Sequence, residues 1–317
     1  MKYLKIFFFP VLIILSFSCK EDFSPYAGHD QKYVLNCILR GDSTFQYAAV
    51  TSSFASSENF SSNVSDRFLK NADIRIWDDN EVYKFRDTVI TTKIYGKETA
   101  ISIYKTTGFV PKPNRKFEIV ALLPDGKRLK SWTNLPKQVN FEFSSSDSSI
   151  PSKNNQFVFV RWESAGEDLI YAPEINIYYK KAGFPLGFAK KVPISYIKQD
   201  GKYYPNFATP SKERFVSIKM DAIRRAMNEI SGSDPNKSNY TILTMIVHVH
   251  TYDKNLSEYY VSSAQSLDQF SINVDALDFS NIEGGLGIFG SYNSKKYVIK
   301  FNREFIGSFG YKVGVEE

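Results

Sequence analysis

The chain has only two cysteines and three histidines among its 317 residues, and this scarcity limits the chemistry that it can carry. It also lacks a Gly-x-Ser-x-Gly elbow, a phosphate-binding glycine loop ending in Lys and Ser or Thr, and a His-Glu-x-x-His helix. No repeat of fixed period and no second long apolar segment occur. The usual signatures of hydrolases, nucleotide-binding proteins and metalloproteases are therefore absent from the sequence.

The N-terminal segment has the pattern of a bacterial lipoprotein signal. Lys2 and Lys5 precede an apolar run at 6–17, which is too short to span a bilayer as a stable helix. Ser18 is a small residue directly before Cys19, so residues 1–18 are predicted to be removed and the Cys19 thiol to carry lipid. An ordinary secretory peptide and an N-terminal anchor helix are the alternatives. Two or more acyl chains on Cys19 would hold the protein to a membrane.

The residues after the cysteine indicate where the protein lies. Cys19-Lys20-Glu21-Asp22 resembles the export signal of surface lipoproteins in Bacteroidetes, in which a lysine and two acids follow the lipidated cysteine. Residues 19–31 are polar, contain Pro25 and Gly28, and are predicted to form a tether. We therefore expect a lipid-anchored outer-membrane protein on the cell surface, with the periplasmic face of that membrane as the alternative.

Composition favours β-structure with a genuine core. Aromatic residues make up 15% of the chain and hydrophobic residues 43%, and aromatic side chains are enriched in strands. The formal net charge is +6, of which Lys2 and Lys5 belong to the signal segment. Because the positive charges form no block, no nucleic-acid partner is expected.

The fold class is predicted as mainly β, with two antiparallel β-sandwich-like units. The first unit, 32–143, is expected to be immunoglobulin- or prealbumin-like, and Pro124-Asp125-Gly126 between two strand-like runs indicates a hairpin. Its strands are expected at about 32–40, 45–54, 72–77, 82–85, 101–110, 116–122 and 128–133.

The second unit, 156–317, follows a serine-rich boundary at 144–155. Apolar spacing at 219–230 predicts one amphipathic helix, and a second short helix is possible at 255–267. Strands are expected at Val139–Phe143 before the boundary, and then at 156–162, 170–180, 187–194, 214–218, 240–252 and 297–305.

Few residues suggest chemistry. His248 and His250 lie two apart in a strand-like run and would share one face. Such a pair binds a metal only if a third ligand joins it, and a plain polar strand face is the simpler interpretation. Cys37 lies in an apolar run and is interpreted as a buried small residue. No catalytic residue, cofactor or metal site is predicted. Acidic residues are common, as in Asp78-Asp79 and in Glu283 near Asp278, and are interpreted as turn and surface residues. Three pairs of adjacent tyrosines are interpreted as core and surface residues: Tyr178-Tyr179, Tyr203-Tyr204 and Tyr259-Tyr260.

The segment 281–290 has the most specific pattern, with Gly284, Gly285, Gly287 and Gly290 among apolar residues. It is predicted to be a structural glycine loop in which backbone approaches backbone closely. With Tyr259-Tyr260 and Gln265 before it, this segment resembles the end of the Bacteroidetes lipoproteins of the domain-of-unknown-function 4249 family. Further points of resemblance are Cys19, the run Tyr33–Leu39, the Asn71-Ala72-Asp73-Ile74 strand start and Leu135-Pro136.

The resemblance implies a role without known catalytic residues. Members of this family are often encoded near TonB-dependent outer-membrane receptors, so it implies a non-enzymatic accessory or binding module for such a receptor. A surface hydrolase of polysaccharide or peptide is one alternative, because acids are abundant. A structural or adhesion component of the envelope is the other, because sandwich units and a tether suffice for it.

Overall fold

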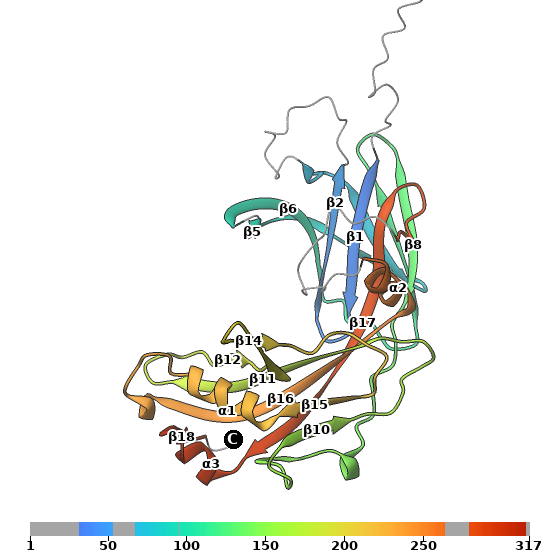
Figure 1. Cartoon of the computed structure of the whole chain (residues 1–317). Helices are drawn as coiled ribbons and strands as arrows, with labels where there is room; N and C mark the ends of the chain where they lie inside the picture. The colour runs from blue at the N-terminus through green and yellow to red at the C-terminus, as the bar shows by residue number, and fades with distance from the viewer. Residues whose placement is uncertain (1–31, 53–66, 95, 264–278, 315–317) are drawn as a thin grey trace, which may run out of the picture.

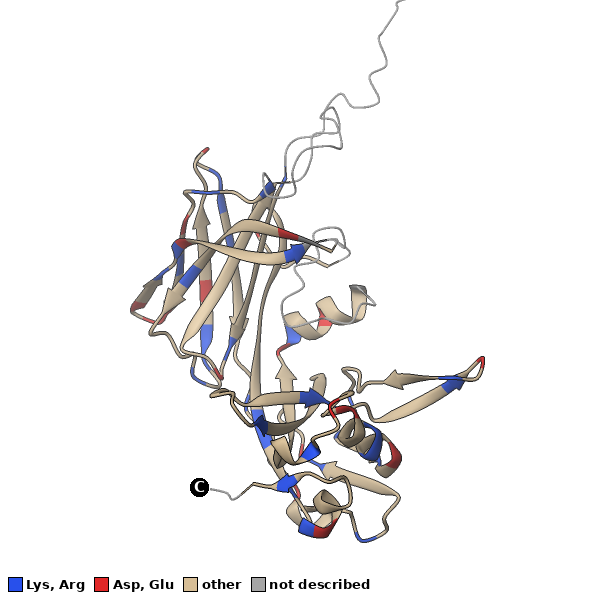
Figure 2. Cartoon of the chain, turned by 90° about the vertical axis from the view of Figure 1, so that its left-hand side faces the viewer, with Lys and Arg blue, Asp and Glu red and all other residues tan. Residues whose placement is uncertain are grey.

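The computed structural model describes residues 32–52, 67–94, 96–263 and 279–314, and shows a mainly β protein (Figure 1). The predicted signal segment, Cys19, the tether and Gln265 lie outside the described residues. Within the described part, no helix is long and apolar enough to cross a membrane. Basic and acidic residues are interspersed along the described chain (Figure 2).

Seven of the eight strands in the first half of the chain lie at the predicted runs, whereas the strand Arg86–Ile94 was not predicted. The hairpin around Gly126 joins β7 and β8. The first eight strands are β1 (Tyr33–Arg40), β2 (Phe45–Ser52), β3 (Asp73–Asp78), β4 (Glu81–Lys84), β5 (Arg86–Ile94), β6 (Lys97–Thr107), β7 (Lys116–Leu122) and β8 (Arg128–Asn134).

The second half adds shorter strands, two long ones and three α-helices within the described residues. The strands are β9 (Ser149–Ile150), β10 (Phe157–Arg161), β11 (Tyr171–Lys181), β12 (Phe188–Lys191), β13 (Ser195–Gln199), β14 (Lys202–Asn206), β15 (Phe215–Lys219), β16 (Tyr240–Tyr252), β17 (Leu286–Phe301) and β18 (Lys312–Val313). The helices are α1 (Met220–Glu229), α2 (Lys254–Ser263) and α3 (Arg303–Gly307). Helix α1 confirms the amphipathic pattern, because Ile223 and Met227 face the core.

Two strand predictions are wrong. The run Val139–Phe143 forms no strand: Phe141 makes a single bridge to Trp162, and a 3-10 turn begins at Phe143. The strand expected at 297–305 begins instead at Leu286 and ends at Phe301. Residues 287–294 are buried throughout, so this part of β17 shows no alternation of apolar and polar residues for a sequence pattern to detect.

One large sheet connects the two halves of the molecule. Its main order is β12-β11-β16-β17-β1-β2-β6-β5, and β17 crosses from one half to the other (Figure 1). Residues Leu286–Tyr292 of β17 pair in parallel with β1, and Tyr292–Ile299 pair antiparallel with β16. The prediction of a mainly β fold of antiparallel sheets is confirmed, and the parallel exceptions among the described strands are the pairs β1–β17, β9–β17 and β16–β18.

The N-terminal half is a sandwich closed by a C-terminal strand. A four-stranded sheet, β4-β3-β7-β8, packs against the β17-β1-β2-β6 part of the large sheet. The core between them includes Leu35, Ile119 and Leu129, and it also contains Ile282 and Phe289 from the other end of the chain. The predicted boundary at 144–155 stays a prediction, since this core draws on residues from both sides of it.

The C-terminal half packs one face of the large sheet against α1 and the β10–β15 pair. Its core contains Ile177 from β11, Val247 from β16 and Ile299 from β17, all fully buried, with Ile223 of α1 and Val158 of β10 packed in the same cluster. The opposite face of the same strands carries the polar side chains described below.

Candidate functional site

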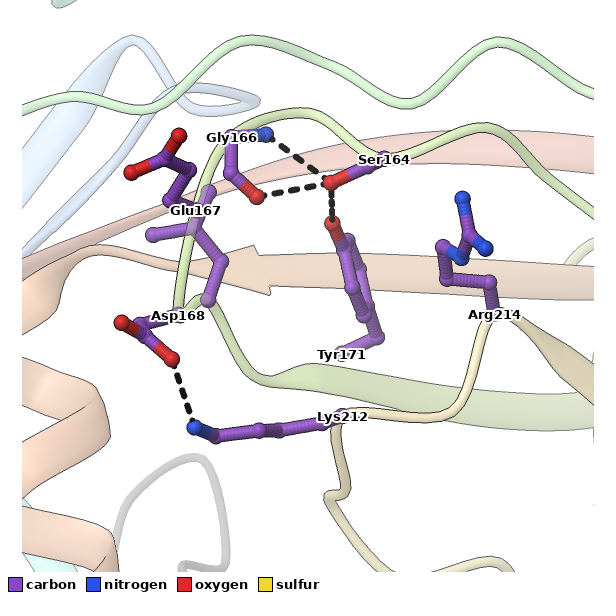
Figure 3. Close-up of a pocket in the computed structure, with 8 residues that line it drawn as sticks. Ser164, Gly166, Glu167, Asp168, Tyr171, Lys212 and Arg214 are labelled. Carbon is purple, nitrogen blue, oxygen red and sulfur yellow. Dashed lines mark hydrogen bonds and ion pairs between the residues drawn. The ribbon is translucent and has the colours of Figure 1, made fainter.

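A hollow of about 620 Å³ lies beside the start of β11 (Figure 3). One wall is the 162–170 loop between β10 and β11, and the other is the chain that leads into β15. The hollow is lined by Ser164, Gly166, Glu167, Asp168, Leu169, Tyr171, Lys212 and Arg214.

Backbone hydrogen bonds at two points hold these walls together. The Trp162 N–H donates to the Arg214 carbonyl at 3.0 Å, and Tyr171 and Ser211 exchange both backbone bonds at 2.8 and 3.0 Å. The Trp162 and Tyr171 rings meet edge to face with centroids 5.9 Å apart. Because both ends of the 162–170 loop are fixed in this way, the hollow is a preformed feature of the fold.

The hydroxyl groups of Ser164 and Tyr171 in the hollow form hydrogen bonds with each other and with the backbone of the 162–170 loop. The Ala165 N–H donates to the Tyr171 hydroxyl at 3.0 Å, which lies 3.2 Å from Ser164 Oγ. Ser164 in turn donates to the Gly166 carbonyl at 2.7 Å. Since an activated serine needs a base that takes its proton, and here the proton goes to a carbonyl, Ser164 serves the shape of the loop.

The charged side chains around the hollow are of both signs. Lys212 Nζ lies 2.8 Å from Asp168 Oδ1, and this contact lowers the pKa of the exposed Asp168 carboxyl. Glu167 and Arg214 make no ion pair with any other described residue. The hollow therefore offers one cation and one carboxylate to a polar ligand, a combination suited to binding.

His248 and His250 share one face of β16, as their spacing predicts. Their rings are nearly parallel, with centroids 6.3 Å apart, and Glu174 of β11 lies 3.9 Å from His250 Nε2. The Tyr178 hydroxyl lies 3.3 Å from His248 Nε2.

Burial decides how these histidines titrate. It lowers the pKa of His250 to about 4 and also lowers that of His248, so both rings are neutral at pH 7. Among the described residues, no group of three or more His, Cys, Asp or Glu side chains is arranged to hold a metal ion.

The glycine motif divides between a turn and a strand, which corrects the prediction of a loop over its whole length. Gly284 and Gly285 lie in the turn before β17, whereas Gly287 and Gly290 lie within β17. A Cβ on Gly287 would stand 2.2 Å from the Leu35 carbonyl oxygen, and one on Gly285 would stand 2.6 Å from that of Tyr33. These approaches arise where β17 begins to pair with β1.

The remaining candidates are dispersed. Asp78 and Asp79 both contact Arg115, the backbone of Glu283 bonds that of Lys130, and Asp278 lies outside the described residues. Cys37 is buried, and burial raises the pKa of its thiol.

The tyrosine pairs are also dispersed over the molecule. Tyr259 is buried, while Tyr203 and Tyr204 are each 49% exposed on the β13–β14 hairpin. The structure brings neither the acids nor these tyrosines together in the hollow.

Sequence reasoning missed the hollow completely. Its two walls are far apart in the chain, and long-range pairing brings them together: Tyr171 with Ser211, and Trp162 with Arg214. The polar stretch from Glu163 to Asp168 between two strands was the one local signal, and such a stretch is typical of any surface loop.

Fold and site define a mainly β protein with an open polar hollow beside β11 and a polar histidine face on β16. The family model for a domain of unknown function, DUF4249, matches residues 20–297. The chain belongs to this family. A search of curated proteins gives no match.

Proposed function

We propose that this chain is a surface-exposed lipoprotein of the Bacteroidetes outer membrane, anchored through Cys19, that assists uptake by a TonB-dependent receptor as a non-enzymatic binding module. The observation that carries the proposal is the order of basic residues, apolar run and Ser18-Cys19 at the N-terminus. A polar stretch of twelve residues separates Cys19 from Lys32, and it spans about 40 Å when fully extended.

The direction of β1 supports this arrangement. Strand β1 runs toward the C-terminal half, so the start of β1 lies at the far end of the N-terminal half (Figure 1). An anchor attached before Lys32 would put the N-terminal half next to the membrane. The C-terminal half, which carries the hollow and the histidine face, would then lie farther from the bilayer than the N-terminal half (Figure 1).

Hydrogen bonding within the hollow favours binding over hydrolysis. Ser164 gives its proton to a carbonyl and Asp168 is paired with Lys212, so neither is arranged as a nucleophile or as a general acid. A surface hydrolase and a structural envelope component remain the alternatives that the experiments below separate.

The anchor is tested by fractionating cells that produce the wild type and Cys19→Ala. We expect wild type in the outer-membrane fraction and the variant in the soluble fraction. Cys37→Ala is the matched control, because it removes the other cysteine and leaves the signal intact. Retention of Cys19→Ala in the membrane would show that lipid on Cys19 is not the anchor.

The partner is tested by purifying the lipidated protein from outer membranes in mild detergent. Stoichiometric co-purification with a large receptor is the expected result. Recovery of the protein alone, with turnover of a polysaccharide or peptide panel that is lost on single Asp or Glu substitutions, would instead establish the hydrolase.

A further inference from the structure

Strand β5 is the last strand at one end of the large sheet, in the part of the chain that the structure describes. It pairs with β6 along its whole length of nine residues, and no other strand of the described residues pairs with its outer side. An open strand edge presents a row of backbone N–H and C=O groups to which another strand can add. The strand is rich in β-branched residues, which favour pairing: Thr88, Val89, Ile90, Thr91 and Thr92.

The centre of β5 has an apolar side chain on each face. Val89 is 66% exposed, whereas Ile90 is partly buried against a small apolar cluster that contains Ile101 and Ile103. A strand added to this edge would cover part of Val89 and would extend the cluster beyond Ile90. Burial of apolar surface would therefore add to the backbone hydrogen bonds.

The charges of β5 are complementary to those of a second copy of the same strand. If two copies pair antiparallel with Ile90 opposite Ile90, Asp87 of each copy lies opposite Lys93 of the other. Thr88 then faces Thr92, and Val89 faces Thr91. Opposite charges across a strand pair stabilise it, and the arrangement has the two-fold symmetry of most protein dimers.

Neighbouring registers are less favourable. A slip of one residue in one direction places Arg86 opposite Lys93, and like charges directly opposite are destabilising. The same slip puts Ile90 on the face of Val89. Within the chain, Asp87 lies opposite Tyr104 and interacts with its hydroxyl, and Lys93 lies opposite Glu98 of β6. In the dimer, Lys93 would lie between two carboxylates, Glu98 and Asp87 of the second copy.

We propose that two copies of this chain associate through their β5 edges, with the two-fold axis at Ile90, so that their large sheets join into one. Two strands of nine residues form a small interface, and the affinity is expected to be on the order of micromolar. This inference does not depend on the proposed function.

The first test is sedimentation of the protein, purified in mild detergent, from about 1 to 100 µM, a range that spans the expected affinity. Wild type is expected to shift from monomer to dimer. Asp87→Lys and Lys93→Glu each create two like-charge pairs across the interface and should weaken dimerisation by about tenfold or more. Lys93→Glu also places a carboxylate opposite Glu98 of its own chain, so Asp87→Lys is the cleaner of the two single variants. The double variant restores opposite charges and should recover the dimer.

Lys202→Glu is the matched control, since it makes the same charge change on β14, away from β5, and should dimerise as wild type. Circular dichroism and melting temperature show that each variant is folded. A protein that stays monomeric throughout the range overturns the proposal and leaves the edge to a strand of another protein. A dimer that Asp87→Lys does not weaken also overturns it.

The second test is the register, measured by spin labels on Val89→Cys or Arg86→Cys. Identical labels are offset along the paired strands by two residues at position 89 and by eight at position 86, or about 7 and 27 Å. A short distance at 89 and a long one at 86 is the expected result. Long distances at both positions would place the dimer contact elsewhere and overturn the proposal.

Discussion

Asp253 is expected to make the protein less stable as the pH rises. Its carboxylate is buried at the start of α2, where Oδ1 accepts the N–H groups of Leu256 at 2.9 Å and Ser291 at 3.1 Å. The Thr133 hydroxyl donates to Oδ2, so the side chain joins β8, β17 and α2. No described cation pairs with it, and burial raises its pKa from 3.8 to about 6.

The sign and size of the effect follow from this pKa. The folded protein binds the Asp253 proton more tightly than the unfolded chain, so the associated stability is fully present below about pH 4 and is lost as the pH rises through 6. A difference of about two pKa units corresponds to about 3 kcal/mol. Burial lowers the pKa of His250 to about 4, which gives the opposite slope, because that histidine loses stability as the pH falls. The wild-type profile alone therefore combines two opposing contributions.

Asp253→Asn separates them. The amide oxygen keeps the two backbone bonds, its NH₂ group can donate to Thr133 Oγ1, and the site no longer titrates. We expect the free energy of unfolding of the variant, minus that of wild type, to rise by about 3 kcal/mol between pH 4 and pH 7. His248 and His250 titrate in the wild type and in the variant alike, so their contributions cancel in the difference between the two free energies of unfolding.

The measurement is urea unfolding of both proteins at several pH values, with Asp200→Asn as the control. Asp200 is an exposed turn residue in the left-handed region, which asparagine tolerates. The control should remain parallel to wild type. A difference between Asp253→Asn and wild type that is the same at pH 4 and pH 7 would refute the reasoning, because it would mean that the buried carboxyl does not titrate between those values.

Three further predictions concern the closing strand and its surroundings. Gly287→Val should lower the free energy of unfolding by about 3 kcal/mol or more, because its φ is +114° and a Cβ would meet the Leu35 carbonyl at 2.2 Å. The control is Gly307→Ala, where a Cβ meets nothing within 4 Å, and its melting temperature should be almost unchanged. Equal losses of stability in the two variants would contradict the argument from backbone approach. Phe289→Ala should lower the free energy of unfolding by about 3–5 kcal/mol, since its fully buried ring lies in the core of the N-terminal half. Backbone amides of that half should then exchange hydrogen faster. Faster exchange in the C-terminal half alone would count against a core shared between the two ends of the chain. Cys37, buried with a raised thiol pKa, should react with a thiol reagent only as fast as the chain unfolds in urea, and rapid labelling of the native protein would disprove its burial.

Local patterns predicted most of the strands and one helix well. The alternation in Asp73–Trp77, the Gly126 turn and the spacing of Ile223 and Met227 in α1 are short-range features, and such features are determined by neighbours in the chain. The prediction at Val139–Phe143 was wrong because an apolar run can be buried without pairing as a strand. Strand β17 was placed too late because it is buried on both faces, which removes the alternation that reveals a strand.

The hollow could not be predicted in the same way. Ser164 and Arg214 are ordinary polar loop residues in sequence, and they face one hollow only because Trp162 bonds to Arg214 and Tyr171 to Ser211. The buried state of Asp253 was equally hidden, although an aspartate directly before a helix is a recognised cap. Its pKa is raised by burial between Thr133 and Ser291, which are 158 residues apart in the chain.

The sequence by itself determined the class of secondary structure, the turns, the amphipathic helix and the close backbone approach at the glycine motif, because each depends on the intrinsic geometry of a few adjacent residues. Tertiary structure alone decided that β17 lies in parallel beside β1, that its Phe289 completes the core of the N-terminal half, and that two distant loops border an open hollow. Those outcomes depend on which surfaces are buried against each other, and long-range burial is a property of the whole chain that no local pattern records.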